Sequence, residues 1–411
     1  MKSYSQYITE ADANLHMTHL EDAVIDGGVK GTRNVINYIR NIRDMLSGNT
    51  KAPVSLTTKW DGAPAIFAGV DPADGKFFVA KKGVFNKTPK LYKTNDEIDN
   101  DLSGELNSKF KVALKEFAKL GIEGVVQGDF LYTDDDLKTE NIDGESCVTF
   151  HPNTIVYAVP KTSSLGKQIT GSKIGVVWHT TYSGSTLETM SASFGQAIST
   201  KLNNVKTVWH VDATFEDKSG TATMTKAETD NLTAMLSKAG TLFRGIDATI
   251  LNELGTNADL NQKINTFINT KVRAGQRIGS VKPFVIGLQR YIQEFYKKEA
   301  DKRKTPAGKK TQMDKATAAL QVFADPSNKR KLEAIFTLYD LFVDMKYIII
   351  AKLNTVEGIR TLLKTKNGFE VTGQEGFVAI DHYSSNALKI VDRMGFSQAN
   401  FSDKYIKGWQ K

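Results

Sequence analysis

The chain has 411 residues, 40% of them apolar, and carries a formal net charge of +8. This length exceeds one compact core, so two or three structural units are expected, and the basic surplus favours a nucleic-acid partner. One cysteine, no secretory signal segment and no apolar run long enough to span a membrane exclude a disulfide-stapled, secreted or membrane protein, so a cytoplasmic protein is expected.

The first half of the chain is predicted to change from helix to strand near residue 51. Residues 1–50 form an N-terminal helical segment in this prediction, because apolar residues recur three and four positions apart before Gly48. Residues 51–220 carry short β-like runs between turn residues, with one helix from Phe110 to Leu120. The expected strands cover residues 65–68, 76–80, 124–127, 154–159 and 174–178, an α+β pattern dominated by antiparallel pairing.

The second half is predicted to be helical over residues 221–365, with strands returning over 366–411. A basic stretch, 297–310, lies between two of the expected helices. A solvated loop is the favoured interpretation of this stretch, and contact with a phosphate backbone is the alternative. In the second case Arg273 and Arg277 would extend the same surface.

A K-x-D-G tetrapeptide, Lys59-Trp60-Asp61-Gly62, follows the first predicted strand. It is weak evidence alone, since average residue usage produces it in roughly one chain in ten of this length. Its weight comes from the segments that follow in order: Lys81-Lys82-Gly83, Gln127-Gly128-Asp129, Tyr157 within a strand, Glu375-Gly376-Phe377-Val378 and Ala387-Leu388-Lys389. Each segment is ordinary in isolation, and the order of all six carries the information.

In this order the segments resemble the motifs of the covalent nucleotidyltransferases, which comprise ATP-dependent DNA ligases, RNA ligases and mRNA capping enzymes. Residues 51–160 and 370–411 match, and the start of the first match also resembles ligase-like proteins of large tailed phages. The resemblance implies a nucleotidyltransferase (ATP-grasp-like) domain of antiparallel sheets, whose first part is 51–220 and whose closing part is 366–411. The helical region 221–365 would be a large insertion, and a phage-encoded protein would act in the host cytoplasm.

The resemblance also assigns roles to the matching residues. Lys59 would be the nucleophile that takes AMP from ATP, and Asp129 and Glu375 would hold Mg²⁺ or Mn²⁺. Tyr157 would stack on adenine, although Phe150 competes for that role. The remaining nucleotide-binding residues would be Thr58, Asp61, Gly62, Lys82 and Lys389.

Two positions depart from the family pattern. Asp129 stands where the family usually has glutamate, which shortens the reach of the carboxylate, and Ala387 stands where a second lysine is common. The carboxylates are nevertheless of the type that magnesium prefers, because it binds hard oxygen ligands.

The chemistry requires an unprotonated amine, because the lone pair of Lys59 must attack the α-phosphorus of ATP. Free lysine titrates near 10.4. Partial burial, together with the positive charges of Lys82, Lys389 and a metal ion, is expected to lower the pKa of Lys59.

The short stretch after Lys389 leaves no room for the OB fold with which DNA ligases and capping enzymes normally continue. An RNA ligase is therefore the leading prediction, joining a 5′-phosphate to a 3′-hydroxyl through a lysyl-AMP intermediate. A DNA ligase acting on nicks is the first alternative. The second is a non-catalytic nucleic-acid-binding or virion-associated protein on the same fold.

Overall fold

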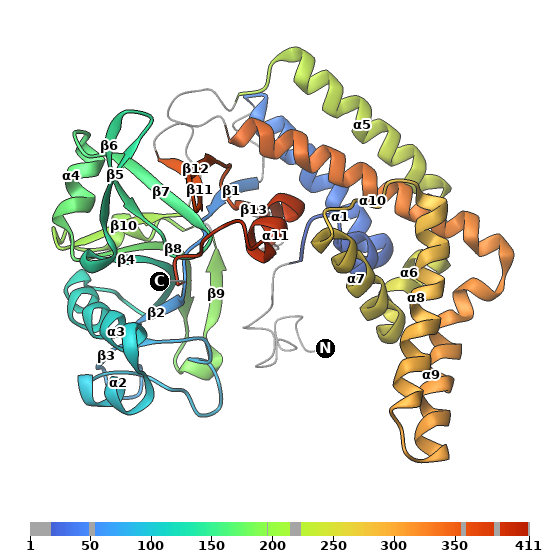
Figure 1. The fold of residues 1–411 in the computed structure, drawn as a ribbon, viewed down its shortest axis with the longest axis horizontal. Coiled ribbons are helices and arrows are strands. Elements are labelled where there is room, and N and C mark those ends of the chain that lie inside the picture. The colour runs from blue at the N-terminus through green and yellow to red at the C-terminus, as the bar shows by residue number, and fades with distance from the viewer. Residues whose placement is uncertain are drawn as a thin grey trace.

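The chain has an α+β fold in which a part built from sheets and a helical part lie side by side (Figure 1). The computed structural model describes residues 18–48, 54–194, 196–213, 223–354, 359–381 and 387–409. The sequence-based prediction of an α+β chain is confirmed, while the predicted segments 1–17 and 214–222 lie outside the described residues.

The smallest sheet joins the beginning and the end of the chain. It has the order β1-β13-β14, with β1 at Val54–Lys59, β13 at Gly376–Asp381 and β14 at Ala387–Val391. Both pairings are antiparallel, and the register sets Lys59 opposite Gly376. Two segments that are far apart in the sequence are thus fixed next to each other by backbone hydrogen bonds.

A second sheet has the order β10-β8-β4-β2-β3, and β9 pairs with β8. Its strands are β2 (Ala65–Val70), β3 (Phe77–Ala80), β4 (Val125–Thr133), β8 (Ile174–Ser183), β9 (Ser191–Phe194) and β10 (Val208–Asp212). The β8–β10 pair is parallel and departs from the expected antiparallel pattern, because the connection through β9 returns the chain in the same direction. Helices α2 (Asn95–Asp101) and α3 (Gly104–Phe117) cover one face, where Phe117 packs edge-on against Trp178.

A third sheet has the order β12-β11-β7-β6-β5. Its strands are β5 (Lys138–Ile142), β6 (Glu145–Phe150), β7 (Ile155–Pro160), β11 (Arg360–Thr365) and β12 (Gly368–Val371), and α4 (Ser164–Gly171) follows β7. Strand β11 corrects the prediction that helix continues to residue 365. It pairs antiparallel with β7, a partner about two hundred residues earlier, which no local pattern of the sequence reveals.

The helical part comprises α1 and the run of helices between β10 and β11. Their bounds are α1 (Ala23–Leu46), α5 (Lys226–Gly245), α6 (Ala248–Thr256), α7 (Ala258–Arg273), α8 (Val281–Asp301), α9 (Pro306–Ala324) and α10 (Pro326–Leu353), and α11 (Arg393–Phe401) follows β14. Single 3-10 turns occupy Ala118–Leu120, Asp134–Asp136, Leu187–Thr189 and Ser199–Lys201. Proline at the first turns of α9 and α10 suits positions whose N–H groups have no partner within the helix.

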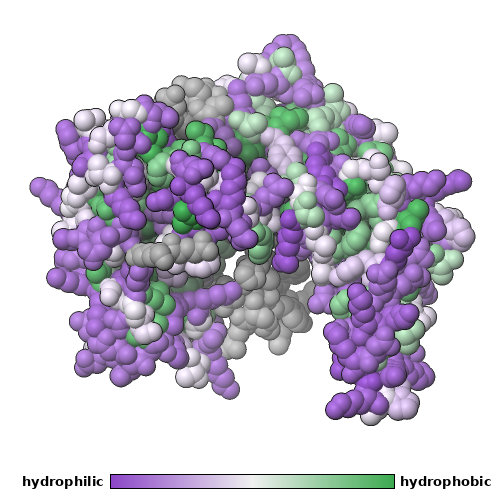
Figure 2. Space-filling model, in the orientation of Figure 1, coloured by the Kyte–Doolittle hydropathy of each residue, from purple (hydrophilic) through white to green (hydrophobic). Residues whose placement is uncertain are grey.

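The helices share one hydrophobic core with the smallest sheet. Leu56 of β1, Phe377 of β13 and Ile390 of β14 belong to the same buried cluster as the apolar faces of α1 and α10. The helical part therefore packs against the sheet that contains β1, the strand whose last residue is Lys59. None of the described helices is long and apolar enough to span a membrane, and the face shown in Figure 2 is mostly hydrophilic.

Candidate active site

Lys59 is the last residue of β1, and its side chain turns toward the loop that precedes β13. Its ammonium group donates a hydrogen bond to the carboxylate of Glu375 and forms an ion pair with it. The Glu375 side chain is only 9% exposed, so this pair is largely withdrawn from water. Gly376 has φ +152°, and a Cβ there would lie 2.6 Å from the carbonyl oxygen of Ile390. Glycine is therefore needed next to Glu375 for the three strands to close up.

Asp61 is buried, and its carboxylate organises the loop that precedes β7. It accepts hydrogen bonds from Asn153 Nδ2 at 2.7 Å, from the Thr154 N–H at 2.6 Å and from the Ile155 N–H at 2.7 Å. Burial raises the pKa of Asp61, and these hydrogen bonds oppose that change by favouring the charged form. Asp61 thus couples the Lys59 turn to the third sheet.

Gly62 lets the turn after Lys59 pack directly on β4. A Cβ at this position would lie 2.5 Å from the Cβ of Asp129, which is closer than side chains approach one another. The Asp129 side chain is 24% exposed, so it retains access to a ligand. The glycine of the K-x-D-G tetrapeptide therefore has a steric role, which is to admit Asp129 beside the nucleophile candidate.

His179 is a site residue that the sequence did not single out. Gln127 pairs with Thr180 and Gly128 with Trp178, so His179 is the extra residue of a β-bulge in β8. Bulges redirect side chains, and here the imidazole Nε2 lies 3.9 Å from Asp129 Oδ1. Its Nδ1 hydrogen-bonds with Thr180 Oγ1 at 2.7 Å. Burial lowers the pKa of His179, against the opposing effect of Asp129, and so favours the neutral ring.

Lys389 completes the charged cluster from β14, where it lies opposite Val378. Burial lowers the pKa of Lys389, and the nearby positive charge of Lys59 lowers it further. Burial raises the pKa of Glu375 to about 7, against the opposing effect of Lys59. The cluster thus combines two amines with nearby carboxylates, and the pKa of each group depends on how close the other charges lie.

The protein's own groups do not lower the pKa of Lys59 as expected. Burial does act to lower the pKa, but the negative charges of Glu375, Asp129 and Asp61 outweigh it, so the pKa is raised. Carboxylates surround the amine more closely than the cations that the sequence suggested. The carboxylates around Lys59 therefore favour its ammonium form.

The structure places Tyr157 in the core. Its side chain is fully buried, its ring stacks on Phe150 at 5.2 Å between centroids, and Trp60 covers it from another side at 5.0 Å. Its hydroxyl accepts a hydrogen bond of 2.7 Å from the Asp61 N–H. Neither Tyr157 nor Phe150 presents a ring face to a ligand, so the stacking role that the resemblance implied finds no support here.

Thr58 and Lys82 lie near the ends of β1 and β3. Thr58 is half-buried in β1, and its N–H donates to the carbonyl of Ala213 at 2.6 Å. Lys82 lies in the exposed turn after β3. The register places this turn at the end of the sheet where Ala65 pairs with Asp129.

Two carboxylates are available for a divalent cation. Asp129 and Glu375 both act electrostatically on Lys59, and both supply hard oxygen atoms. Within the described ranges no group of three His, Cys, Asp or Glu side chains converges on one point. The donor set fits an ion that takes one or two protein carboxylates and completes its shell with water and phosphate oxygens, which is the usual mode of Mg²⁺.

Comparisons with known proteins give one match. The model of a family described as "Family of unknown function (DUF6267)" matches residues 14–405. No curated protein and no solved structure matches the chain.

Proposed function

We propose that this chain, which belongs to the DUF6267 family, is an ATP-dependent polynucleotide ligase that acts through a lysyl-AMP intermediate at Lys59. RNA is the proposed acceptor. The family model covers residues 14–405, and all the side chains of the cluster around Lys59 lie within this range.

The observation that carries the proposal is the ion pair between Lys59 and Glu375. It joins a K-x-D-G segment to an E-G segment that lies 316 positions later. Asp129 and Lys389 reach the same place from two other strands. An ordinary surface lysine is not enclosed by side chains from distant segments of the chain. A lysine that attacks a nucleotide, by contrast, needs carboxylates and a second cation near the phosphates.

In the first step the Lys59 amine attacks the α-phosphorus of ATP. The N–P bond forms, the bond from the α-phosphorus to the bridging oxygen breaks, and pyrophosphate leaves. The amine must first lose a proton, and the contact between its ammonium form and the Glu375 carboxylate must break before the amine can attack. Lys389 can neutralise charge on the phosphates.

In the second step an oxygen of a 5′-phosphate attacks the phosphorus of the lysyl-AMP, and the N–P bond breaks as Lys59 regains a proton. In the third step a 3′-hydroxyl attacks the activated 5′-phosphate. AMP leaves, the hydroxyl proton is released, and a phosphodiester bond remains. The chain's own contribution to these steps is the positioning of the reacting groups by Asp61, Gly62 and Asp129.

A divalent cation would be held by Asp129 and Glu375. When bound, it would supply positive charge to the phosphates of ATP and lower the cost of the charge that develops on pyrophosphate. Engagement of Glu375 in this way would also reduce the negative charge that raises the pKa of Lys59.

The test is incubation of the purified protein with α-labelled ATP and magnesium, after pyrophosphate has removed any bound AMP. A covalent label that survives denaturation and alkali but is released by acid, as expected of an N–P bond, should appear on the wild type and on Lys76→Ala, which alters an exposed lysine in the β2–β3 turn. Lys59→Ala should carry no label. If the wild type takes no label, the ligase proposal is refuted and the alternative of a nucleic-acid-binding protein is left. If it is labelled, the labelled protein can be offered single-stranded RNA and nicked DNA to identify the acceptor.

A further inference from the structure

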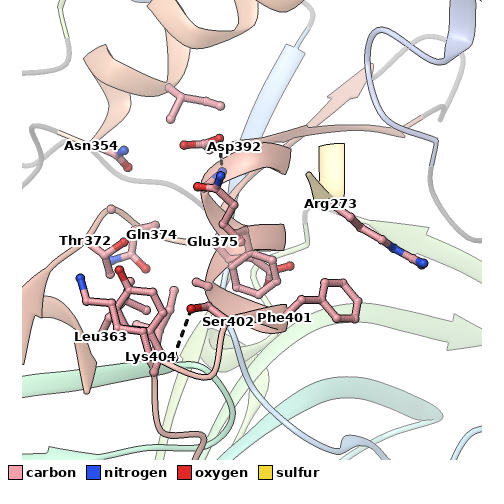
Figure 3. A pocket seen from close by; sticks show the side chains of 18 residues that line it. Arg273, Asn354, Leu363, Thr372, Gln374, Glu375, Asp392, Phe401, Ser402 and Lys404 are labelled. Atoms are coloured by element: carbon pink, nitrogen blue, oxygen red, sulfur yellow. Dashed lines mark hydrogen bonds between the residues drawn. The ribbon is translucent and has the colours of Figure 1, made fainter. Parts of the chain in front are cut away.

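A cavity of about 530 Å³ lies beside Glu375, between the helical part and the end of the chain. Arg273 at the end of α7 and Asn354 after α10 form its helical side, and the segment from Thr372 to Glu375 forms another side. Figure 3 shows these side chains, and Ser402 and Lys404 of the segment after α11 also line the cavity. Because Glu375 is also the partner of Lys59, this cavity adjoins the candidate nucleophile.

An aromatic ring and a guanidinium group form one edge of the cavity. Phe401 is 67% exposed, and the Arg273 guanidinium carbon lies 5.1 Å from the centroid of its ring. Figure 3 shows the two side chains next to each other on one side of the opening. By contrast, Arg277 is bound to Asp340 and Asp344 at 3.0 and 2.7 Å, so its charge is neutralised. Of the two arginines that the sequence suggested, Arg273 is the one that faces the cavity.

A second exposed aromatic residue follows on the same terminal segment. Trp409 is 68% exposed, and the N–H of the preceding Gly408 donates to the carbonyl of Asn153 at 2.6 Å. Thr154, in the same loop, donates from its hydroxyl to Asn400, which precedes Phe401. Both exposed aromatic residues are thus attached to the loop that holds Asp61.

The inner wall of the cavity offers amide and hydroxyl groups. Asn354, Thr372, Gln374 and Gln398 line it. The Gln374 Oε1 atom is buried and has no hydrogen-bond partner among the described residues. A buried acceptor without a partner is costly, and a donor from a ligand would satisfy it.

We propose that this cavity binds the single-stranded RNA end whose 5′-phosphate receives AMP, and the inference rests on the proposed ligase function. Exposed aromatic rings stack on bases, and an arginine contacts the phosphate backbone. The amide wall can accept the 2′-hydroxyl, a donor that RNA has and DNA lacks. A phosphate that enters past Phe401 toward Glu375 approaches Lys59. Docking of another protein is less favoured, because amide, hydroxyl and charged groups lie among the apolar side chains of the lining and break up any apolar face.

The test measures RNA binding and lysyl-AMP formation on the same full-length proteins. The probe is a short 5′-phosphorylated single-stranded RNA with a 3′ fluorophore, followed by fluorescence anisotropy over a series of salt concentrations. The variants are Phe401→Ala and Arg273→Gln. The matched controls are Ile286→Ala, an exposed apolar residue of α8, and Arg244→Gln, an exposed arginine of α5.

We expect all five proteins to form lysyl-AMP. Phe401→Ala should bind the RNA about tenfold more weakly, and Arg273→Gln should reduce the salt dependence of log K by about one, while the controls match the wild type. If all variants form lysyl-AMP and bind RNA equally well, the RNA site is overturned and the ligase proposal still stands. A cavity that docks another protein would give this same result. A wild type without lysyl-AMP overturns the proposed function instead, whatever its RNA affinity.

Discussion

The ammonium group of Lys59 is paired with the carboxylate of Glu375, which lies 316 positions later in the chain. The antiparallel pairing of β1 with β13 creates this contact, because Lys59 lies opposite Gly376. The pair favours the protonated form of Lys59. In the proposed ligase reaction, the contact between Glu375 and Lys59 would have to weaken before the amine could attack.

Glu375→Gln is expected to lower the pKa of Lys59. Glu375 is the strongest of the charges that raise this pKa, and loss of an opposite charge lets burial dominate, so the midpoint should fall. At any pH below the wild-type midpoint, a larger fraction of the variant amine is then unprotonated. The pH dependence of Lys59 acetylation by limiting acetic anhydride, read by peptide mass spectrometry, measures the midpoint. Glu370→Gln, which affects the exposed pair with Lys404, should leave it unchanged.

Gly62→Ala is expected to reduce lysyl-AMP formation by about 100-fold, the usual effect of a shift of about 1 Å in a reacting group. The new Cβ would lie 2.5 Å from the Cβ of Asp129, so the Lys59 turn and β4 must move apart. Gly27→Ala is the control, since a Cβ at that helical position meets nothing within 4 Å. Adduct formation at the wild-type rate in Gly62→Ala would contradict the packing argument.

Asp61→Asn is expected to destabilise the protein by about 1–3 kcal/mol, because an amide nitrogen replaces one of the oxygens that accept from Asn153, Thr154 and Ile155. Urea unfolding followed by circular dichroism measures the free energy of unfolding. Asp74→Asn, in the exposed β2–β3 turn, should change it by much less. Equal effects of the two substitutions would show that Asp61 does not organise the loop before β7.

A buried ion pair joins the N-terminal segment to α10, where Lys346 Nζ lies 2.6 Å from Glu21 Oε1 and both side chains are almost fully buried. Lys346→Met removes the nearest cation of the buried Glu21 carboxylate and leaves it to the more distant Arg393 at 3.8 Å, so it should cost about 3–5 kcal/mol in the free energy of unfolding. Adding Glu21→Gln should recover much of that loss, because it removes the buried charge that has lost its nearest partner. Lys226→Met, which breaks an exposed pair with Asp230, should cost less than about 1 kcal/mol. A double variant no more stable than Lys346→Met would contradict this explanation.

Local features of the sequence were sufficient to predict the α+β class and most of the strands of the first half. Alternation and turn residues are short-range signals, so β2, β3, β7 and β8 were found close to their positions. The order of the K-x-D-G segment, Asp129, Glu375 and Lys389 was also readable, because each lies in a short motif. Strand β11 was missed, since its partner β7 is remote in the sequence.

Only the tertiary structure decided how these residues act on one another. The bulge that turns His179 toward Asp129 arises from the register of β4 against β8, a relation between two strands that neither strand encodes alone. Tyr157 is a stacking candidate in the sequence, but in the folded chain Trp60 and Phe150 pack on its ring and bury it. The pKa of Lys59 depends on its distances to three carboxylates that come from different segments of the chain. Because electrostatic energy falls with distance, the folded arrangement decides whether this pKa is raised or lowered. The sequence determined which groups are present, and their protonation and access followed from the folded arrangement.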